Sequence, residues 1–289
     1  MHGVLVLDKP RDMSSASAVE HVRRRLGIKR AGHGGTLDPI ATGVLAICLG
    51  EATKLAGYLL ADDKEYEADL VLGSETDTYD RTGVVTSTRP ADHITAEMIE
   101  RVLAARTGEQ DQLPPIYSAI KQDGVRMYHR ARRGETLETI ERTPRRIRID
   151  RLALLDYTAP VARIAIACSK GTYVRSIVAD IGTDLGVGAH MSELRRTRSG
   201  TFTLAQAHDL DRMDNCRIVP LEQATKLPIV IASDDHITKI RNGLQMPPDV
   251  LGVAPEIFQK FQLFNEARKL VAVAHVDRNR VIYDRVFAP

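Results

Sequence analysis

The segment Gly32–Gly43, GHGGTLDPIATG, contains four glycines and one proline, and the fold prediction starts from it. Glycine adopts backbone conformations that other residues avoid, so this segment is predicted to be a sharply bent loop that a ligand can approach closely. Asp38 precedes Pro39, which biases Asp38 towards extended backbone. A carboxylate on such a loop is a candidate nucleophile or general base, although an aspartate that caps a turn would fit the same local pattern. The glycine spacing matches neither a phosphate-binding P-loop nor a dinucleotide-binding fingerprint.

Short apolar strands and amphipathic helices alternate on both sides of this loop. Strands are predicted at Gly3–Asp8, Val44–Leu49, Lys64–Gly73, Val84–Thr88, Ile147–Tyr157 and Val161–Ser169. Helices are predicted at Ser15–Leu26, with Ser15 as its N-cap, and at Glu51–Leu60, Thr95–Arg106 and Thr172–Leu185. This mixture indicates an α/β or α+β catalytic domain.

The chain changes character near Leu227-Pro228. Beyond that point, short β-branched runs are separated by turns, at Ile229–Ile231, Leu270–His275 and Arg280–Val286. This pattern is typical of a small β-barrel, so a domain boundary is predicted at residue 228.

The composition excludes several classes of protein. The 289 residues are 43% hydrophobic and 27% charged, which excludes a disordered or collagen-like chain. The three cysteines lie far apart, so neither a zinc knuckle nor a disulfide framework is expected. We interpret them as buried, reduced thiols of a cytoplasmic protein. The apolar runs are too short to span a membrane, and the N-terminus has no signal-peptide pattern.

Basic residues cluster along the chain although the net charge is only +2. The clusters are His21–Arg30, Gly124–Arg133, Arg142–Arg151 and Glu193–Arg198. Separation of basic from acidic stretches indicates a cationic face for a polyanion, although arginines that only solvate helices would give similar clusters. Arginine outnumbers lysine in these clusters, which favours phosphate contacts.

Two further segments carry candidate site residues. Cys168–Arg175, CSKGTYVR, follows a predicted strand and opens a predicted helix, so Arg175 could hold a carboxylate ionised or could be an ordinary surface arginine. Tyr66 lies in a charged strand of a chain with only 4% aromatic residues. It could be a stacking platform for a base or a cross-strand packing residue.

Several motifs together resemble the TruB-type tRNA pseudouridine synthases of bacteria. In chain order they are Lys9-Pro10, GHGGTLDPIATGVL, GEATK (Gly50–Lys54), DKEY (Asp63–Tyr66), TDTYDRTG (Thr76–Gly83), PPIYSAIKQDG (Pro114–Gly124), CSKGTYVRSI (Cys168–Ile177) and ELRRTRSG (Glu193–Gly200). The similarity extends over roughly residues 3–200. The ending DRNRVIYDRVF resembles, more weakly, the small RNA-binding PUA domain of that family.

The resemblance implies a fold and a reaction. The expected fold is α+β, with a mixed, largely antiparallel sheet, flanking helices and a C-terminal PUA-like barrel. The expected domains are a catalytic domain, 1–228, with a basic RNA-clamping insertion at 113–146, and an RNA-binding domain, 229–289. The family isomerises the T-loop uridine of tRNA, usually numbered 55, to pseudouridine. Its partner is the T-arm stem-loop of tRNA, and no cofactor, metal, membrane or protein partner is implied. The chain shows no heptad pattern, so a monomer is expected.

The resemblance also implies roles for single residues. Asp38 takes the position of the catalytic aspartate, Tyr66 that of the tyrosine that stacks on the target base, and Arg175 that of the arginine paired with the aspartate. Tyr173 would lie near the base edge. The remaining matches are His33, which helps hold the flipped loop, Lys9 and Pro10, which support the floor of the site, and Leu194, which forms an apolar wall.

Two alternatives remain open from the residues. A non-catalytic RNA-binding protein of the same fold would share the basic clusters but would not need Asp38 and Arg175 together. A nucleoside hydrolase would carry a carboxylate cluster that binds Ca²⁺, and no such cluster is found in the sequence.

Overall fold

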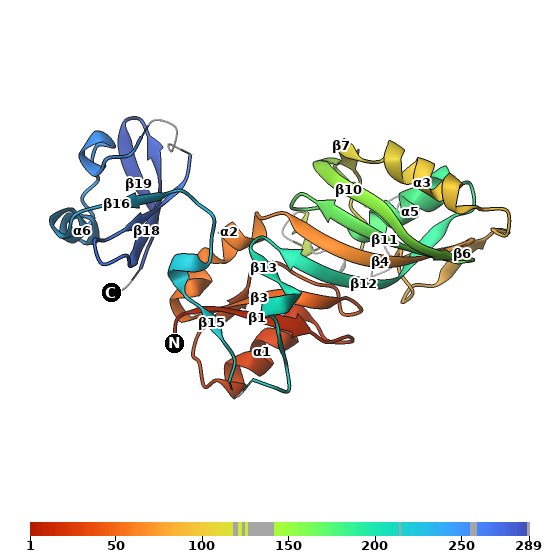
Figure 1. Ribbon diagram of the computed structural model, residues 1–289, viewed down its shortest axis with the longest axis horizontal. Coiled ribbons are helices and arrows are strands. Elements are labelled where there is room, and N and C mark those ends of the chain that lie inside the picture. The colour runs from red at the N-terminus through yellow and green to blue at the C-terminus, as the bar shows by residue number, and fades with distance from the viewer. Residues whose placement is uncertain (118–120, 123–124, 127–141, 214, 255–258, 288–289) are drawn as a thin grey trace.

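A computed structural model describes residues 1–117, 121–122, 125–126, 142–213, 215–254 and 259–287. Eleven strands form the central sheet: β1 (Gly3–Lys9), β2 (Ala31–His33), β3 (Thr42–Leu49), β4 (Lys64–Leu72), β7 (Gly108–Gln112), β10 (Arg145–Thr158), β11 (Val161–Cys168), β12 (Ala189–Ser199), β13 (Phe202–Thr203), β14 (His208–Asp209) and β15 (Ile218–Val219). Their order is β14-β1-β3-β12-β4-β11-β10-β7, with β2, β13 and β15 paired to β3, β12 and β1 (Figure 1). Among the described strands of this sheet, only the β1–β14 and β3–β12 pairs are parallel, so the predicted α+β class with a largely antiparallel sheet is confirmed.

The described chain also contains helices, 3₁₀ turns and two small ribbons. The helices are α1 (Ser15–Arg25), α2 (Ala56–Leu60), α3 (Ala96–Ala105), α5 (Val174–Asp184) and α6 (Asp234–Arg241), and the 3₁₀ turns are η1 (Gly50–Leu55), η2 (Leu204–Gln206), η3 (Leu221–Gln223) and η4 (Asp249–Leu251). Two ribbons lie apart from the sheet, β5 (Ser74–Thr76) with β6 (Val85–Thr88), and β8 (Lys121–Gln122) with β9 (Val125–Arg126). Among the described residues, none of these helices has the length and apolar character needed to cross a membrane.

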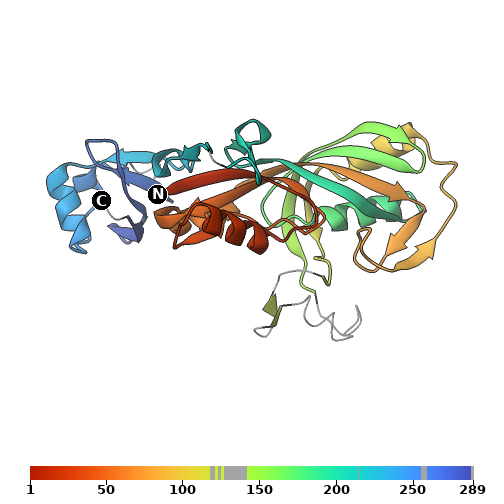
Figure 2. The ribbon, with the colours of Figure 1, turned by 90° about the horizontal axis from the view of Figure 1, so that it is seen from below.

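The centre of the sheet is buried on both faces, as strand β1 shows. Side chains alternate along a strand, so Leu5 and Leu7 face one core while Val4 and Val6 face the other. The first core lies under α1, α3 and α5, and Figure 2 shows α1 and α5 on the same side of the sheet. The continuous apolar run GVLVLD is therefore explained by helices on one side and the C-terminal part of the chain on the other.

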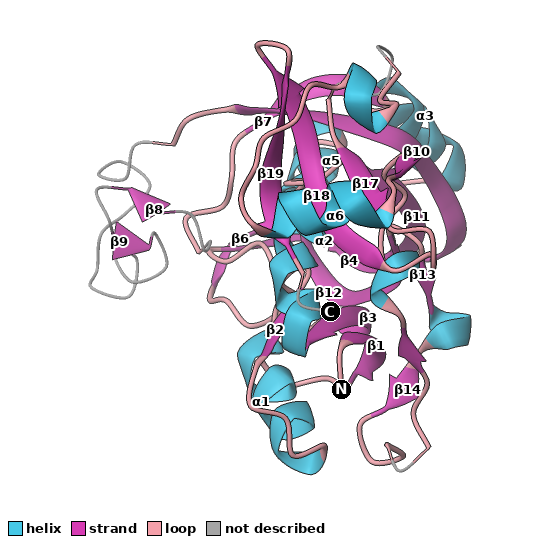
Figure 3. Ribbon diagram, turned by 90° about the vertical axis from the view of Figure 1, so that its left-hand side faces the viewer, coloured by secondary structure: helices cyan, strands magenta, loops and turns pink. Residues whose placement is uncertain are grey.

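The C-terminal part contains a four-stranded sheet, β16 (Ile229–Ile231), β17 (Phe261–Phe264), β18 (Leu270–Asp277) and β19 (Arg280–Val286), in that order (Figure 3). The prediction of a barrel is not confirmed, because β16 and β19 lie at opposite edges and do not close the sheet. Phe264 and Phe287 of this part share a core with Leu55 and Leu59 of the N-terminal part. Division into domains 1–228 and 229–289 stays a prediction.

The strand and helix predictions are largely confirmed, with local corrections. Ser14, not Ser15, caps α1 through a bond from the Ser17 N–H. Both ends of the predicted loop Gly32–Gly43 belong to strands β2 and β3. The predicted helix Glu51–Leu60 is a 3₁₀ segment followed by a short α-helix.

Two further predictions differ from the structure or lie partly outside it. All three cysteines are free thiols, but Cys216 is only partly buried, unlike Cys48 and Cys168. Burial raises the pKa of Cys48 to about 12 and that of Cys168 to about 11, so both are protonated. The predicted RNA-clamping insertion, 113–146, falls largely outside the described residues.

Candidate active site

Asp38 lies in a tight turn between β2 and β3. The Ala41 N–H donates to the Asp38 carbonyl oxygen at 3.0 Å, which closes a β-turn with Pro39 in its second position. Proline suits that position because its φ angle is already restricted to the required value. Leu37 and Ile40 on either side are buried in the core, whereas the Asp38 side chain is 38% exposed. The turn is therefore anchored by apolar contacts, and its carboxylate remains accessible.

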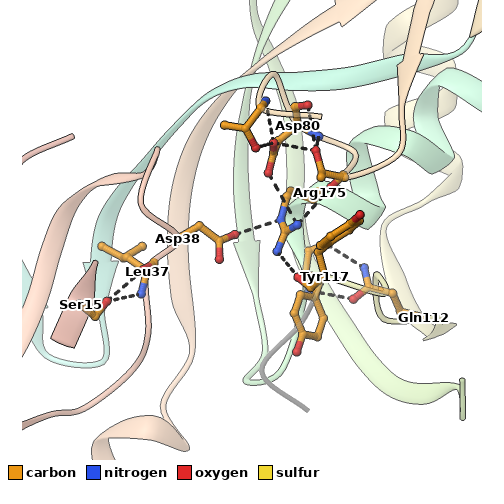
Figure 4. Close-up of polar contacts among 10 residues, drawn as sticks. Ser15, Leu37, Asp38, Asp80, Gln112, Tyr117 and Arg175 are labelled. Carbon is orange, nitrogen blue, oxygen red and sulfur yellow. Dashed lines mark hydrogen bonds and ion pairs between the residues drawn. The ribbon is translucent and has the colours of Figure 1, made fainter. Parts of the chain in front are cut away.

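Polar contacts from β1 and α1 hold this turn in place. The Ser15 hydroxyl donates to the Leu37 carbonyl at 3.0 Å and accepts from the Leu37 N–H at 2.8 Å (Figure 4). The buried Lys9 ammonium donates to the Pro39 carbonyl at 3.2 Å and to the carbonyls of Pro10 and Met13. Burial lowers the pKa of Lys9 to about 8, against the opposing attraction of nearby carboxylates that include Asp38. Ser15 and Lys9 thus fix the backbone directly beside Asp38.

Arg196 of β12 holds the glycine-rich segment through hydrogen bonds to backbone carbonyls. Its side chain is buried and donates to the carbonyls of Gly35, Thr36 and Val44 at 2.7–3.2 Å. Gly43 pairs with Arg196 at a φ of +100°, and a Cβ there would lie 2.2 Å from the Arg196 carbonyl oxygen. Only glycine permits this approach, which explains one of the glycines of the motif.

Arg175 lies in the first turn of α5 and reaches across to Asp38. Its Nε is 3.0 Å from Asp38 Oδ2, and its side chain is 6% exposed. The other guanidinium nitrogens donate to the carbonyls of Thr78, at 3.1 Å, and Tyr117, at 2.9 Å. A buried guanidinium with fixed partners thus orients the accessible carboxylate of Asp38 through an ion pair (Figure 4).

Asp80 is a second carboxylate beside the same guanidinium. Its Oδ2 is 3.6 Å from Arg175 Nη1, and its side chain is 7% exposed. The other oxygen, Oδ1, accepts from the Thr78 hydroxyl at 2.8 Å and from the Thr82 N–H at 2.9 Å. Asp80 is therefore enclosed and already satisfied, which leaves Asp38 as the carboxylate of the pair that faces outward.

Two tyrosines of the sequence prediction lie near this centre. Tyr66 lies in β4 between Ile166 of β11 and Arg196 of β12, is partly buried and packs against the first core. Burial raises the pKa of its hydroxyl, so Tyr66 is neutral at pH 7. Tyr173 is the N-cap residue of α5, two positions before Arg175.

The other predicted site residues have different surroundings. His33 ends β2 and is partly buried, and within the described residues its Nδ1 has no hydrogen-bond partner. Burial lowers the pKa of His33, so the ring is held neutral. Leu194 is buried in β12 opposite Ala68, in the core that also contains Leu37. Pro10 is exposed and contributes its carbonyl to Lys9.

Four side chains shape the site without having been predicted to do so: Ser15 as an anchor, Asp80, Gln112 and Arg196. Asp80 lies inside the motif TDTYDRTG. The threonines two positions before and after it could have indicated that its carboxylate accepts local hydrogen bonds. Arg196 belongs to the basic cluster Glu193–Arg198, which predicts a cationic face, but its side chain is buried. Alternation along β12 turns Arg195 towards Asp8 and Arg196 towards the loop.

Comparisons with known proteins identify the family of this chain. The family model described as TruB family pseudouridylate synthase (N terminal domain) matches residues 23–174. A second model, tRNA pseudouridylate synthase B C-terminal domain, matches residues 175–231.

Curated relatives and solved structures extend the similarity. The tRNA pseudouridine synthase B of Stutzerimonas stutzeri is 48% identical over 212 residues, which is 73% of this chain and 68% of the relative. That of Dehalococcoides mccartyi strain BAV1 is 42% identical over 258 residues, 86% of this chain and 85% of the relative. A chain in the crystal structure of a Cbf5-Nop10-Gar1 complex is 28% identical with a TM-score of 0.76, covering 99% of this chain and 85% of that one.

Proposed function

Because the chain belongs to the TruB family of pseudouridylate synthases, we propose that it isomerises the T-loop uridine of tRNA, position 55, to pseudouridine. The curated relatives are tRNA pseudouridine synthases, which makes this protein an isomerase acting on tRNA. The observation that carries the assignment is the accessible carboxylate of Asp38 paired with the buried guanidinium of Arg175. A non-catalytic RNA-binding protein would have no use for this pair.

Asp38 is the proposed catalytic residue. In the reaction the bond from the ribose to uracil N1 breaks, the ring turns, and a bond to C5 forms. C5 loses a proton and N1 gains one, so atoms balance without an oxidant, a reductant or a second substrate. A carboxylate can attack the sugar, attack the ring or initiate elimination from the sugar, and Asp38 is accessible enough for each of these routes.

Tyr66 is the proposed stacking platform for the target base. A uridine inside a folded loop must leave its stack before a side chain can reach it, which costs a few kcal/mol. Stacking on an aromatic ring returns about 1–3 kcal/mol per base. The partly buried position of Tyr66 in β4, opposite Arg196 of β12, supports this role.

The remaining predicted residues have supporting roles in this proposal. Tyr173 contacts the base edge, Leu194 forms an apolar wall, and the neutral His33 helps hold the displaced loop. Lys9 and Pro10 support the floor, which agrees with the bond from Lys9 to the Pro39 carbonyl. Arg175 pairs with Asp38 and orients its carboxylate.

We further propose the organisation that the sequence predicts. Residues 1–228 are the catalytic domain, 113–146 clamp the RNA through arginines, and 229–289 bind RNA outside the T-arm. The protein acts as a monomer in the cytoplasm and needs no added cofactor.

One assay distinguishes the proposed isomerase from a nucleoside hydrolase. Purified protein, with no metal or cofactor added, is incubated with tRNA labelled with tritium at C5 of uridine. Isomerisation releases tritium to water and leaves every base attached, whereas a hydrolase would release free uracil. Mutation of the T-loop target uridine to cytidine in the tRNA must abolish tritium release if position 55 is the site.

A further inference from the structure

Gln112, the last residue of β7, is bonded twice to one residue of the active-site helix. Its Oε1 accepts from the Tyr173 N–H at 2.8 Å, and its Nε2 donates to the Tyr173 carbonyl at 3.0 Å (Figure 4). The Gln112 side chain is buried, so water does not compete well for these bonds. Both polar groups of one amide are therefore used to fix one backbone unit.

That backbone unit is the start of α5. Tyr173 is the N-cap residue, and its own side chain makes no capping bond. The Tyr173 carbonyl also accepts the first bond of the helix, from the Ile177 N–H at 3.2 Å. Gln112 thus supplies, from a distant strand, part of the anchoring that a capping side chain usually provides.

A second contact fixes the rotation of the same turn. The Ser176 hydroxyl donates to the Leu113 carbonyl at 3.1 Å, directly after Gln112 in the chain. Arg175 lies between Tyr173 and Ser176, the two residues that are tied to β7 and its end. Its Nε must reach Asp38 Oδ2 on a separate loop, so a small shift of this turn changes the geometry of the ion pair.

We propose that Gln112 is a positioning residue that places the first turn of α5 so that Arg175 meets Asp38. Gln112 acts through Arg175 and does not contact the uridine. This inference rests on the proposed function and adds to it a residue that sets the rate without contributing to tRNA affinity.

The test compares Gln112→Leu with Gln110→Leu. Gln110 lies in the same strand and also bonds to a backbone carbonyl, that of Arg106, but not to α5. Single-turnover pseudouridine formation and tRNA affinity are measured for both variants. Displacement of a catalytic group by a fraction of an ångström to 1 Å slows reactions by about 10- to 100-fold. We expect that loss for Gln112→Leu, with tRNA affinity within about threefold, and little loss for Gln110→Leu.

Two further variants distinguish positioning from general destabilisation. Gln112→Glu keeps the acceptor for the Tyr173 N–H and should restore part of the rate. In an Arg175→Lys background the ion pair is already changed, so Gln112→Leu should slow the reaction by less than about threefold more. Equal rates for the Gln112→Leu and Gln110→Leu variants, or independent effects of Gln112→Leu and Arg175→Lys, would overturn the inference. If the wild-type protein makes no pseudouridine, the proposed function itself fails; if it does and Gln112→Leu is unimpaired, only this inference fails.

Discussion

Arg175 and Asp38 form an ion pair whose two members differ sharply in exposure, 6% for the arginine and 38% for the aspartate. The guanidinium is fixed by carbonyls of Thr78 and Tyr117, so the pair is rigid on the side of the cation. The carboxylate is therefore oriented by the protein and remains open to a substrate on its other side.

Asp38→Asn should abolish turnover and leave tRNA affinity within a few-fold. The amide keeps the size of the side chain and loses the negative charge and the nucleophilic oxygen. Tritium release and filter binding of tRNA measure the two quantities separately. Substantial activity in a preparation free of wild-type enzyme would remove Asp38 from the mechanism.

Arg175→Met should inactivate the enzyme and destabilise it by about 3–5 kcal/mol, because it leaves the buried carboxylate of Asp80 without its cation. The matched control is Arg89→Met, which breaks an ion pair between an exposed arginine and the partly exposed Glu75. The control variant should lose about 1 kcal/mol or less of its free energy of unfolding. Chemical unfolding of both variants checks the comparison, and similar losses would show that Asp80 does not depend on Arg175.

Tyr66 should contribute its ring more than its hydroxyl to binding. Tyr66→Phe is expected to bind tRNA nearly as the wild type does, whereas Tyr66→Leu should lose stacking worth about 1–3 kcal/mol. Binding is the cleaner measurement, because turnover could fall in Tyr66→Phe if the hydroxyl takes part in proton transfer. Equal affinities of the two variants would refute the stacking role.

Lys64 should make stability rise with pH. Its ammonium is buried and donates to the carbonyls of Leu59, Leu60 and Asp62, and burial lowers its pKa from 10.5 to about 8. Between these two values the unfolded chain binds a proton that the folded chain has released, so the free energy of unfolding increases with pH. Unfolding at pH 8, 9 and 10 should give a steeper rise for the wild type than for Lys64→Met. Equal slopes of the free energy of unfolding against pH for the two proteins would contradict the lowered pKa of Lys64.

Removal of residues 229–289 should leave a folded, catalytically competent chain that binds whole tRNA less tightly. The truncation uncovers apolar side chains such as Leu55 and Leu59, so the midpoint of thermal unfolding should fall. Each lost phosphate contact lowers the log–log salt slope of binding by about 0.7–0.9. An isolated T-arm hairpin should bind both proteins equally. If the truncation weakens binding of the hairpin and of whole tRNA equally, or leaves the chain unfolded, the C-terminal part is a structural support only.

Local sequence patterns predict the class of fold and most element positions, and they single out Asp38 as a candidate carboxylate. These features depend on local signals: the alternation in Lys64–Leu72, the Thr95 cap of α3, and glycines around a single Asp-Pro step. Such signals act over a few residues and are therefore readable along the chain. The family resemblance then pointed to Arg175 as the partner of Asp38, 137 positions away, and the structure brings the two together.

The folded chain alone shows which polar side chains turn inward to hold the site. Asp80 and Gln112 are separated from Arg175 and Tyr173 by more than 60 residues, and neighbouring arginines of β12 have opposite surroundings because strand side chains alternate. The open C-terminal sheet likewise depends on contacts between segments that are far apart in the sequence. Closure depends on whether the edge strands β16 and β19 meet, and no local pattern within either strand specifies that. Contacts of this kind are set by the path of the whole chain, so they become visible only when the chain is folded.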